Sequence, residues 1–132
     1  MNDLYDNEIK SIKDKTSLSV KSDPAQFFYG FIILCYGVSY MENGISFVGY
    51  LHILSGGLHL MLGFLSFTWK SHNVKILQAF SKFSYAFLLL VLLAMGILKS
   101  MIILGFALLF ILFGYWNLKQ YKSMSKIAAS NK

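Results

Sequence analysis

The sequence predicts an all-α integral membrane protein: a polytopic four-helix bundle built from two antiparallel helical hairpins. Three observations predict this fold class. Four long apolar segments cover most of the chain, each near the ~20 residues that a helix needs to cross about 30 Å of hydrocarbon. The hydrophobic fraction of 56% is too high for an ordinary soluble domain of 132 residues. Eleven of the twelve lysines lie in three polar stretches, which is the pattern that sets the orientation of membrane proteins.

The first span is predicted over residues 24–41. Asp23 can cap its free amides, Pro24 fits the first helical position, and Gln26 can close a capping box, so the helix is expected to begin there. The preceding residues 1–23 carry mixed charge and do not have the basic start of a secretory signal. They are expected to form a flexible cytoplasmic segment.

A tight reversal is predicted after the first span. Asn43 and Gly44 form an Asn-Gly pair, which favours a positive φ and leaves few residues before the second span, residues 45–69. Trp69 marks the cytoplasmic end of that span, since an indole prefers the headgroup layer. The first two spans are therefore expected to form an antiparallel hairpin.

The middle polar stretch, residues 70–82, carries three lysines. Val74, Leu77 and Phe80 recur in it at three-residue spacing. This spacing predicts a short amphipathic helix that lies on the membrane surface before the third span, residues 79–98.

A second hairpin is predicted from the third and fourth spans. The link between them is short and ends in Ser100, which can serve as the N-cap of the fourth span, residues 101–118. Tyr115 and Trp116 are expected to anchor this span in the headgroup layer. Residues 119–132 follow as a basic cytoplasmic tail.

The lysines indicate the orientation. Four precede the first span, three lie in the middle stretch and four in the tail, whereas Lys99 is the only lysine in the two hairpin turns. Cytoplasmic segments carry the excess of lysine in membrane proteins. The sequence therefore predicts a multi-pass protein of the cell membrane, with both termini and the middle stretch in the cytoplasm.

The two hairpins could be tandem repeats. Sliding the chain by 56 residues aligns residues 27–31 with residues 83–87 and carries Gly49 onto Gly105. Two such copies would run parallel, related by an axis along the membrane normal. The alternative is two unrelated apolar hairpins that resemble each other by composition.

Glycines recur at seven-residue intervals in the first hairpin. They are Gly30, Gly37 and Gly44 in the first arm, and Gly49, Gly56 and Gly63 in the second. Seven residues is close to two helical turns, so each set forms a stripe along which a neighbouring backbone can approach closely. We expect one stripe to pack the two spans together, and the other is left open to self-association.

A polar face is the candidate functional site within the membrane, because intramembrane polar groups are costly and often functional. It comprises His52, Ser55, His59 and Glu42, and in a pore it would line the path. The two histidines share a helix face but stand ~10 Å apart along the axis, too far to bind one metal ion together. With Cys35 they are weak metal or haem candidates, and interhelical hydrogen bonds are the simpler explanation. No cofactor is expected.

The remaining composition excludes several classes of function. The net charge of +6 comes from lysines that flank apolar spans, with no arginine, so nucleic-acid binding is not expected. No phosphate loop, HExxH or CxxC motif is present, and no enzyme activity is predicted. The sequence predicts an accessory, scaffold or immunity-type protein that acts through helix contacts in the bilayer, as a homo-oligomer or with a membrane partner. The alternative is a small oligomeric transporter or channel subunit. A haem or metal-binding membrane subunit is the third candidate.

Overall fold

The computed structural model describes residues 6–9, 24–68 and 72–130. Within these ranges the protein is helical and has no strand, which confirms the predicted all-α class. Residues 6–9 form a short helical turn, and the rest of the predicted flexible segment, residues 1–23, lies outside the described residues. The long helices are α2 (Pro24–Glu42), α3 (Ser46–Thr68), α4 (Asn73–Ala94) and α5 (Met101–Ser130).

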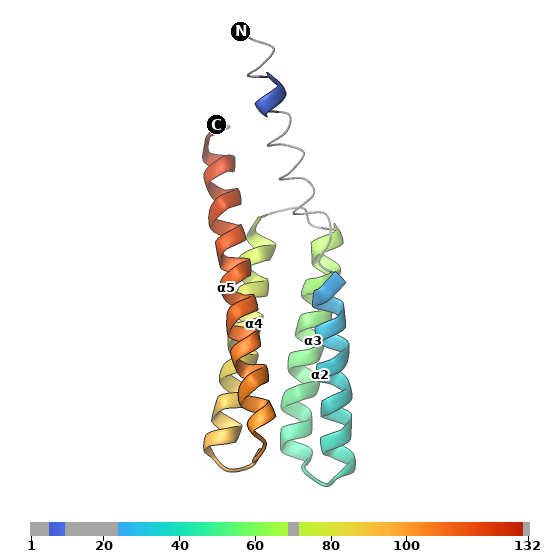
Figure 1. The fold of residues 1–132 in the computed structure, drawn as a ribbon. Coiled ribbons are helices and arrows are strands. Elements are labelled where there is room, and N and C mark those ends of the chain that lie inside the picture. The colour runs from blue at the N-terminus through green and yellow to red at the C-terminus, as the bar shows by residue number, and fades with distance from the viewer. Residues whose placement is uncertain (1–5, 10–23, 69–71, 131–132) are drawn as a thin grey trace.

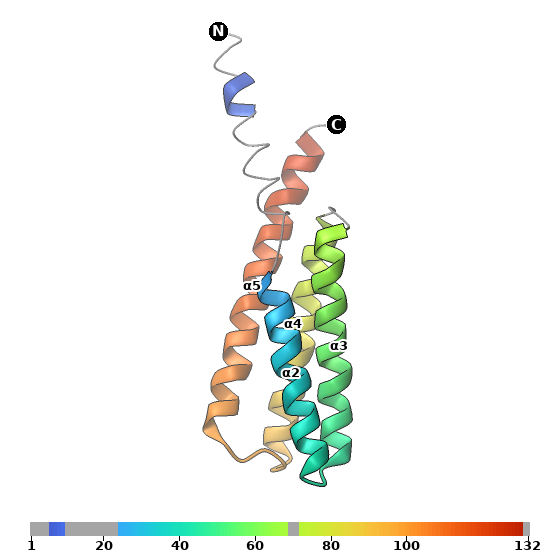
Figure 2. The ribbon, with the colours of Figure 1, turned by 90° about the vertical axis from the view of Figure 1, so that its right-hand side faces the viewer.

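These helices lie side by side in two pairs (Figures 1 and 2). α2 packs along α3, α4 packs along α5, and the main contact between the pairs is that of α3 with α4. The links within the two pairs, residues 43–45 and 95–100, lie at the same end of the molecule, and α5 extends beyond the other helices at the opposite end (Figure 1).

Glycines in the left-handed conformation end α2 and α4. Gly44 has a φ of +79°, and the N–H of Ile45 donates to the carbonyl of Tyr40 at 2.9 Å, the hydrogen bond of a Schellman motif. The predicted reversal at this glycine is confirmed. Gly96, with a φ of +71°, ends α4 in the same way, so the helix stops at Ala94 rather than four residues later as predicted.

The start of α5 follows the prediction and its end goes beyond it. The N–H of Ile102 donates to Ser100 Oγ at 3.3 Å, which confirms this serine as the N-cap. The helix then continues through the segment predicted as a basic tail and ends at Ser130. Lysines do not interrupt a helix, and α5 meets neither proline nor glycine beyond Gly114.

The prediction of a surface helix over residues 70–82 is wrong. α4 is one continuous helix from Asn73, in which Leu77 and Phe80 are exposed while Lys75 and Lys82 are buried. A surface helix would point its lysines outward. Here Lys75 and Lys82 are buried, and the three predicted apolar positions do not share one face, since Val74 is buried whereas Leu77 and Phe80 are exposed.

The predicted capping box at the start of α2 is also wrong. Gln26 is fully buried, and its Nε2 donates to Ser81 Oγ on α4 at 3.3 Å. Among the residues that the structure describes, its Oε1 atom has no hydrogen-bond partner, and no capping bond is seen. The side chain therefore joins two helices instead of closing the end of one, and the predicted cap Asp23 lies outside the described residues.

Both glycine stripes face each other between α2 and α3. A Cβ atom added at Gly56 would stand 2.9 Å from the carbonyl oxygen of Gly30, and one added at Gly37 would stand 3.0 Å from that of Gly49. Gly63 packs against Phe27 in the same interface. The two backbones are in contact at these points, so neither stripe is left for a second copy of the chain.

The other pair packs differently. Gly114 on α5 lies against the ring of Phe83, but a Cβ added at Gly105 would meet nothing within 4 Å. The 56-residue alignment therefore pairs Gly49, which contacts the backbone of α2, with Gly105, which lies in open surroundings. The two pairs do not share one packing scheme.

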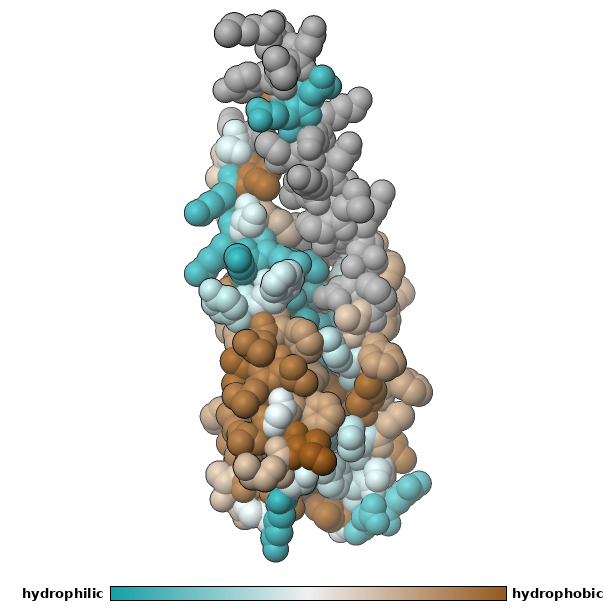
Figure 3. All heavy atoms as spheres, viewed as in Figure 1, coloured by the Kyte–Doolittle hydropathy of each residue, from teal (hydrophilic) through white to brown (hydrophobic). Residues whose placement is uncertain are grey.

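Three of the helices, α3, α4 and α5, have the length and the apolar composition needed to cross a membrane. α2 is shorter, with 19 residues, and contains a glutamine, a proline and three tyrosines. On the face shown in Figure 3, apolar side chains form a broad band between hydrophilic residues at the two ends.

Candidate functional site

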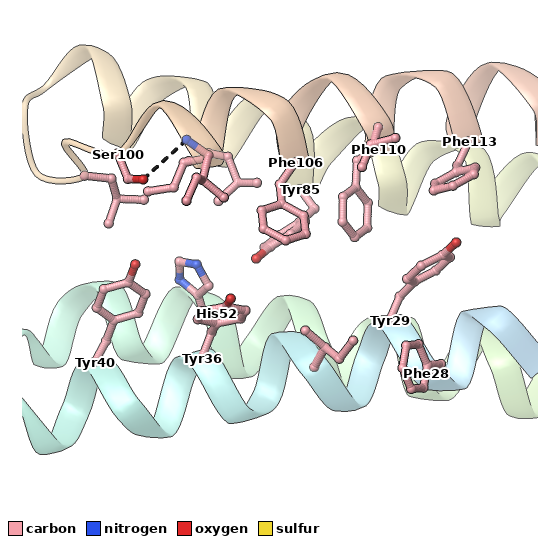
Figure 4. A pocket seen from close by; sticks show the side chains of 16 residues that line it. Phe28, Tyr29, Tyr36, Tyr40, His52, Tyr85, Ser100, Phe106, Phe110 and Phe113 are labelled. Atoms are coloured by element: carbon pink, nitrogen blue, oxygen red, sulfur yellow. Dashed lines mark hydrogen bonds between the residues drawn. The ribbon is translucent and has the colours of Figure 1, made fainter.

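The two helix pairs leave a cavity of about 470 Å³ between α2 and α5. Figure 4 shows side chains reaching into it from both pairs. Pockets for small molecules typically have volumes of about 300–1,000 Å³. The cavity is therefore large enough to hold a small ligand or one aliphatic chain.

Aromatic and aliphatic side chains form the walls of the cavity. From α2 they are Phe28, Tyr29, Ile32, Tyr36 and Tyr40, and from α5 they are Ile102, Ile103, Phe106, Leu109, Phe110 and Phe113. In each helix these residues are adjacent or recur at steps of three or four, so each set occupies one helix face. On α2 this face is distinct from the glycine face that packs on α3.

Four of the remaining lining residues form the floor and one end. His52 of α3, with Tyr85 and Leu89 of α4, closes the cavity on the inner side, and Ser100 lies at the end near the helix links. The His52 ring stands 5.7 Å from that of Tyr85 and 5.0 Å from that of Tyr40, measured between centroids. These aromatic contacts hold the imidazole in a fixed position on the cavity wall.

His52 presents a hydrogen-bond acceptor to the cavity. The side chain is 1% exposed, and its Nδ1 lies 2.9 Å from the carbonyl oxygen of Val48. A carbonyl can only accept, so Nδ1 carries the proton and Nε2 of the neutral ring is an acceptor. Nδ1 is thus engaged within α3, and Nε2 is the ring nitrogen left to accept a hydrogen bond from another group.

A second set of polar side chains is buried deeper, toward the lysine-rich end. Gln78 of α4 accepts a hydrogen bond from Asn117 of α5 at 3.4 Å, and Ser81 of α4 accepts one from Gln26 of α2. Lys82 Nζ lies 5.8 Å from the ring centroid of Tyr29. These contacts connect α4 to both α2 and α5 through polar groups, and the Lys82 contact reaches the cavity wall at Tyr29.

Of the predicted polar face, only His52 reaches the cavity. His59 is fully buried, with its Nδ1 donating to the carbonyl of Ser55 at 2.9 Å, and its Nε2 has no hydrogen-bond partner among the described residues. The rings of His52 and His59 both contact that of Tyr85, so the two histidines share the buried face of α3. Glu42 lies apart from them, exposed at the end of α2.

His52, His59 and Cys35 were only weak metal candidates in the sequence. Among the residues that the structure describes, no group of three or more His, Cys, Asp and Glu side chains is arranged to hold a metal ion. The exposed Cys35 does not line the cavity that His52 reaches.

The predicted interfacial anchors have separate outcomes. Tyr115 and Trp116 are exposed on α5, and Trp69 lies outside the described residues. Exposure on the outer face of a helix is the position that an interfacial anchor requires.

The cavity itself was missed by the sequence analysis. The signal was present on α2, where Tyr29, Tyr36 and Tyr40 lie on one face, but aromatic residues at such spacing are equally typical of lipid-facing surface. Which face of α2 packs on another helix depends on the glycine contacts, and those are known only from the structure.

Comparison with known proteins gives no further identification. The chain matches no protein-family model, and no characterised protein or solved structure is similar to it.

Proposed function

We propose that this chain is a multi-pass protein of the cell membrane that crosses the bilayer four times as two antiparallel hairpins. It acts by binding within the bilayer, as an accessory, scaffold or immunity-type protein does, and carries out no covalent chemistry. Its binding site is the cavity between α2 and α5, which receives a molecule from the lipid phase.

The packing of α2 supports a fourth crossing. This helix contacts α3 from Phe27 to Met41, and α3 is apolar and long enough to span. Phe28 and Phe31 of α2 are 64% and 63% exposed, which suits contact with lipid and is unfavourable in water. The polar Gln26, which lowers the hydropathy of α2, is buried against Ser81 and does not meet lipid.

The distribution of charge supports the proposed orientation. Lys119, Lys122 and Lys126 are exposed on the extension of α5, whereas the links at the other end carry Lys99 and the adjacent Glu42. The excess of lysine at one end favours that end for the cytoplasm.

The single observation that carries the binding role is the composition of the cavity. Helix interfaces in membranes use small residues that let backbones approach, as α2 and α3 do. The walls between α2 and α5 carry large side chains instead, such as Phe106 and Tyr36. They hold the helices apart and leave a volume that suits a small apolar molecule better than a partner helix.

This role can be tested with a photoreactive hydrocarbon that carries a diazirine midway along its chain. In membranes containing the wild-type protein, the label is expected on residues that line the cavity. Ile32→Trp should remove most of this labelling, because the larger ring occupies the cavity. Phe31→Trp, on the neighbouring exposed position, should leave it unchanged. Labelling spread evenly over exposed residues and equal in both variants would contradict the proposal.

Transport or conduction is a second candidate. It is supported by three buried polar atoms that have no hydrogen-bond partner within the described part of the chain: Gln26 Oε1, His59 Nε2 and Gln78 Nε2. Such atoms are costly unless water or a passing ion satisfies them. Proton flux in reconstituted vesicles that is lost on Gln78→Leu would favour this candidate, and tight vesicles would favour the binding role.

A further inference from the structure

The polar groups of the cavity gather toward one end (Figure 4). Tyr36, Tyr40, Ser100 and the imidazole of His52 belong to the end near the helix links, and the Tyr85 hydroxyl lies between the two ends. The opposite end is lined by the rings of Phe28, Phe110 and Phe113 and by Tyr29, whose hydroxyl is a polar group there and whose ring is contacted by Lys82. This asymmetry is that of an amphiphile, with a head at the links and a tail toward the lysine-rich end.

The polar groups define the hydrogen bonds that the head must make. His52 Nε2 can only accept, because Nδ1 carries the proton, so the head must offer a donor. Ser100 Oγ accepts from the N–H of Ile102, which leaves the serine hydroxyl hydrogen free to donate. A hydroxyl group meets both needs at once, whereas a ketone or an ether can only accept.

The head must also be uncharged. No Asp, Glu, Lys or Arg lines the cavity among the described residues, and its wall is mostly apolar. At the end near the links, a carboxylate or an ammonium group would lose its hydration without gaining a counter-charge, which is strongly unfavourable. This excludes an ionised fatty acid whose head lies at that end.

The length of the cavity fits one chain within one leaflet. Along α5 the lining runs from Ile102 to Phe113, a distance of about 17 Å at ~1.5 Å per residue. Half of a hydrocarbon core that is about 30 Å thick is similar in length. Tyr40 and Ser100 would then lie near the headgroup layer on the side of the helix links.

We infer that the cavity binds a long-chain alcohol, with its hydroxyl group between His52 and the Tyr36 and Tyr40 hydroxyls and its single chain extended toward Phe113. This inference rests on the binding role proposed above and adds the chemical class and orientation of the ligand.

Competition against the photoreactive hydrocarbon tests the class of ligand. Three competitors of equal chain length are added at equal mole fraction in the membrane: hexadecanol, its methyl ether and palmitate. Hexadecanol should protect the cavity most. The ether, which cannot donate to His52, should be about fivefold weaker, the effect of one lost hydrogen bond. Palmitate should be about tenfold weaker or more, because its charge would be buried unpaired.

Removal of one hydroxyl group tests the orientation. Tyr36→Phe should weaken protection by hexadecanol about fivefold and leave protection by the ether less affected. Tyr50→Phe is the matched control, since Tyr50 is exposed on α3 and does not line the cavity. Both substitutions remove one oxygen atom at an exposed position, so both variants should fold.

The outcomes separate the two proposals. If the hydrocarbon labels the cavity but all three competitors protect equally, or Tyr36→Phe has no effect, the long-chain alcohol is wrong and the binding role stands. If the hydrocarbon never labels the cavity, the binding role itself is wrong. Stronger protection by palmitate than by hexadecanol would overturn the uncharged head.

Discussion

The close packing of α2 against α3 depends on the absence of a Cβ atom at four glycines. At Gly30, Gly37, Gly49 and Gly56 there is no room for a Cβ, because the carbonyl or amide of the opposite helix occupies the space. Without a hydrophobic driving force between helices in lipid, such close contact is a main source of helix association. A methyl group at these positions would force the backbones apart.

Adjacent glycines on α3 give a matched test of this contact. Gly56→Ala places a Cβ 2.9 Å from both Gly30 O and Leu34 N, so we expect a loss of about 1–3 kcal/mol in stability. Gly57→Ala meets nothing within 4 Å and should be neutral or stabilise by up to about 1 kcal/mol. Unfolding in mixed detergent micelles measures both. Equal stability of the two variants would show that the close approach is not important.

At the level of elements, α4 is the helix whose residues were hardest to assign from the sequence. Its apolar composition and its general position were predictable, as were the starts of α2 and α5. Its inward-facing Lys75, Gln78 and Lys82 were not, because lysine near a span normally marks the membrane surface. Only the positions of Gln26 and Asn117 on neighbouring helices show that this face meets polar partners.

The cavity at the candidate site could not be predicted for the same reason: the sequence does not show which helices a side chain meets. His52 stood out in the sequence because a polar residue in an apolar span is unusual. Tyr36, Phe106 and Leu109 carry no such signal, since lipid contact and a cavity wall require the same residue types. Their role depends on how far apart α2 and α5 lie, which local sequence does not determine.

A double-mutant cycle tests the polar contact between α4 and α5. Asn117→Leu alone leaves Gln78 Oε1 buried without its donor, and Gln78→Leu alone leaves the Asn117 amide without its acceptor. The double variant removes both groups, so it should be more stable than the sum of the single losses predicts. We expect a coupling of about 0.6 kcal/mol, the average for such bonds between membrane helices. Strict additivity would mean that the pair contributes nothing.

At the scale of the whole molecule, two tightly packed pairs meet mainly through α3 and α4. This arrangement leaves α2 and α5 separated by a cavity and places both links at one end. In the proposed orientation those links face away from the cytoplasm, so that a ligand head lies near the outer surface and the lysines lie inside.

Cysteine labelling tests this orientation. In a Cys35→Ser background, cysteines at Asn43 and Ile97 should react with a membrane-impermeant maleimide added to intact cells, because both positions are exposed in the links. A cysteine at Ala128, exposed near the end of α5, should react only after permeabilisation. Labelling of Ala128→Cys in intact cells would show that the orientation is the opposite of the one proposed. Labelling at only one of the two links would place the links on opposite sides of the membrane and contradict four crossings.

The central claim is that the space between α2 and α5 holds a molecule from the lipid phase, and two neighbouring leucines test it most directly. Leu108 and Leu109 are both partly exposed on α5, but only Leu109 lines the cavity. Native mass spectrometry of protein purified in mild detergent should find a bound lipid-phase molecule on the wild type and on Leu108→Trp, and should find it lost from Leu109→Trp. A wild-type protein that carries no such molecule, or equal retention by both variants, would contradict the account.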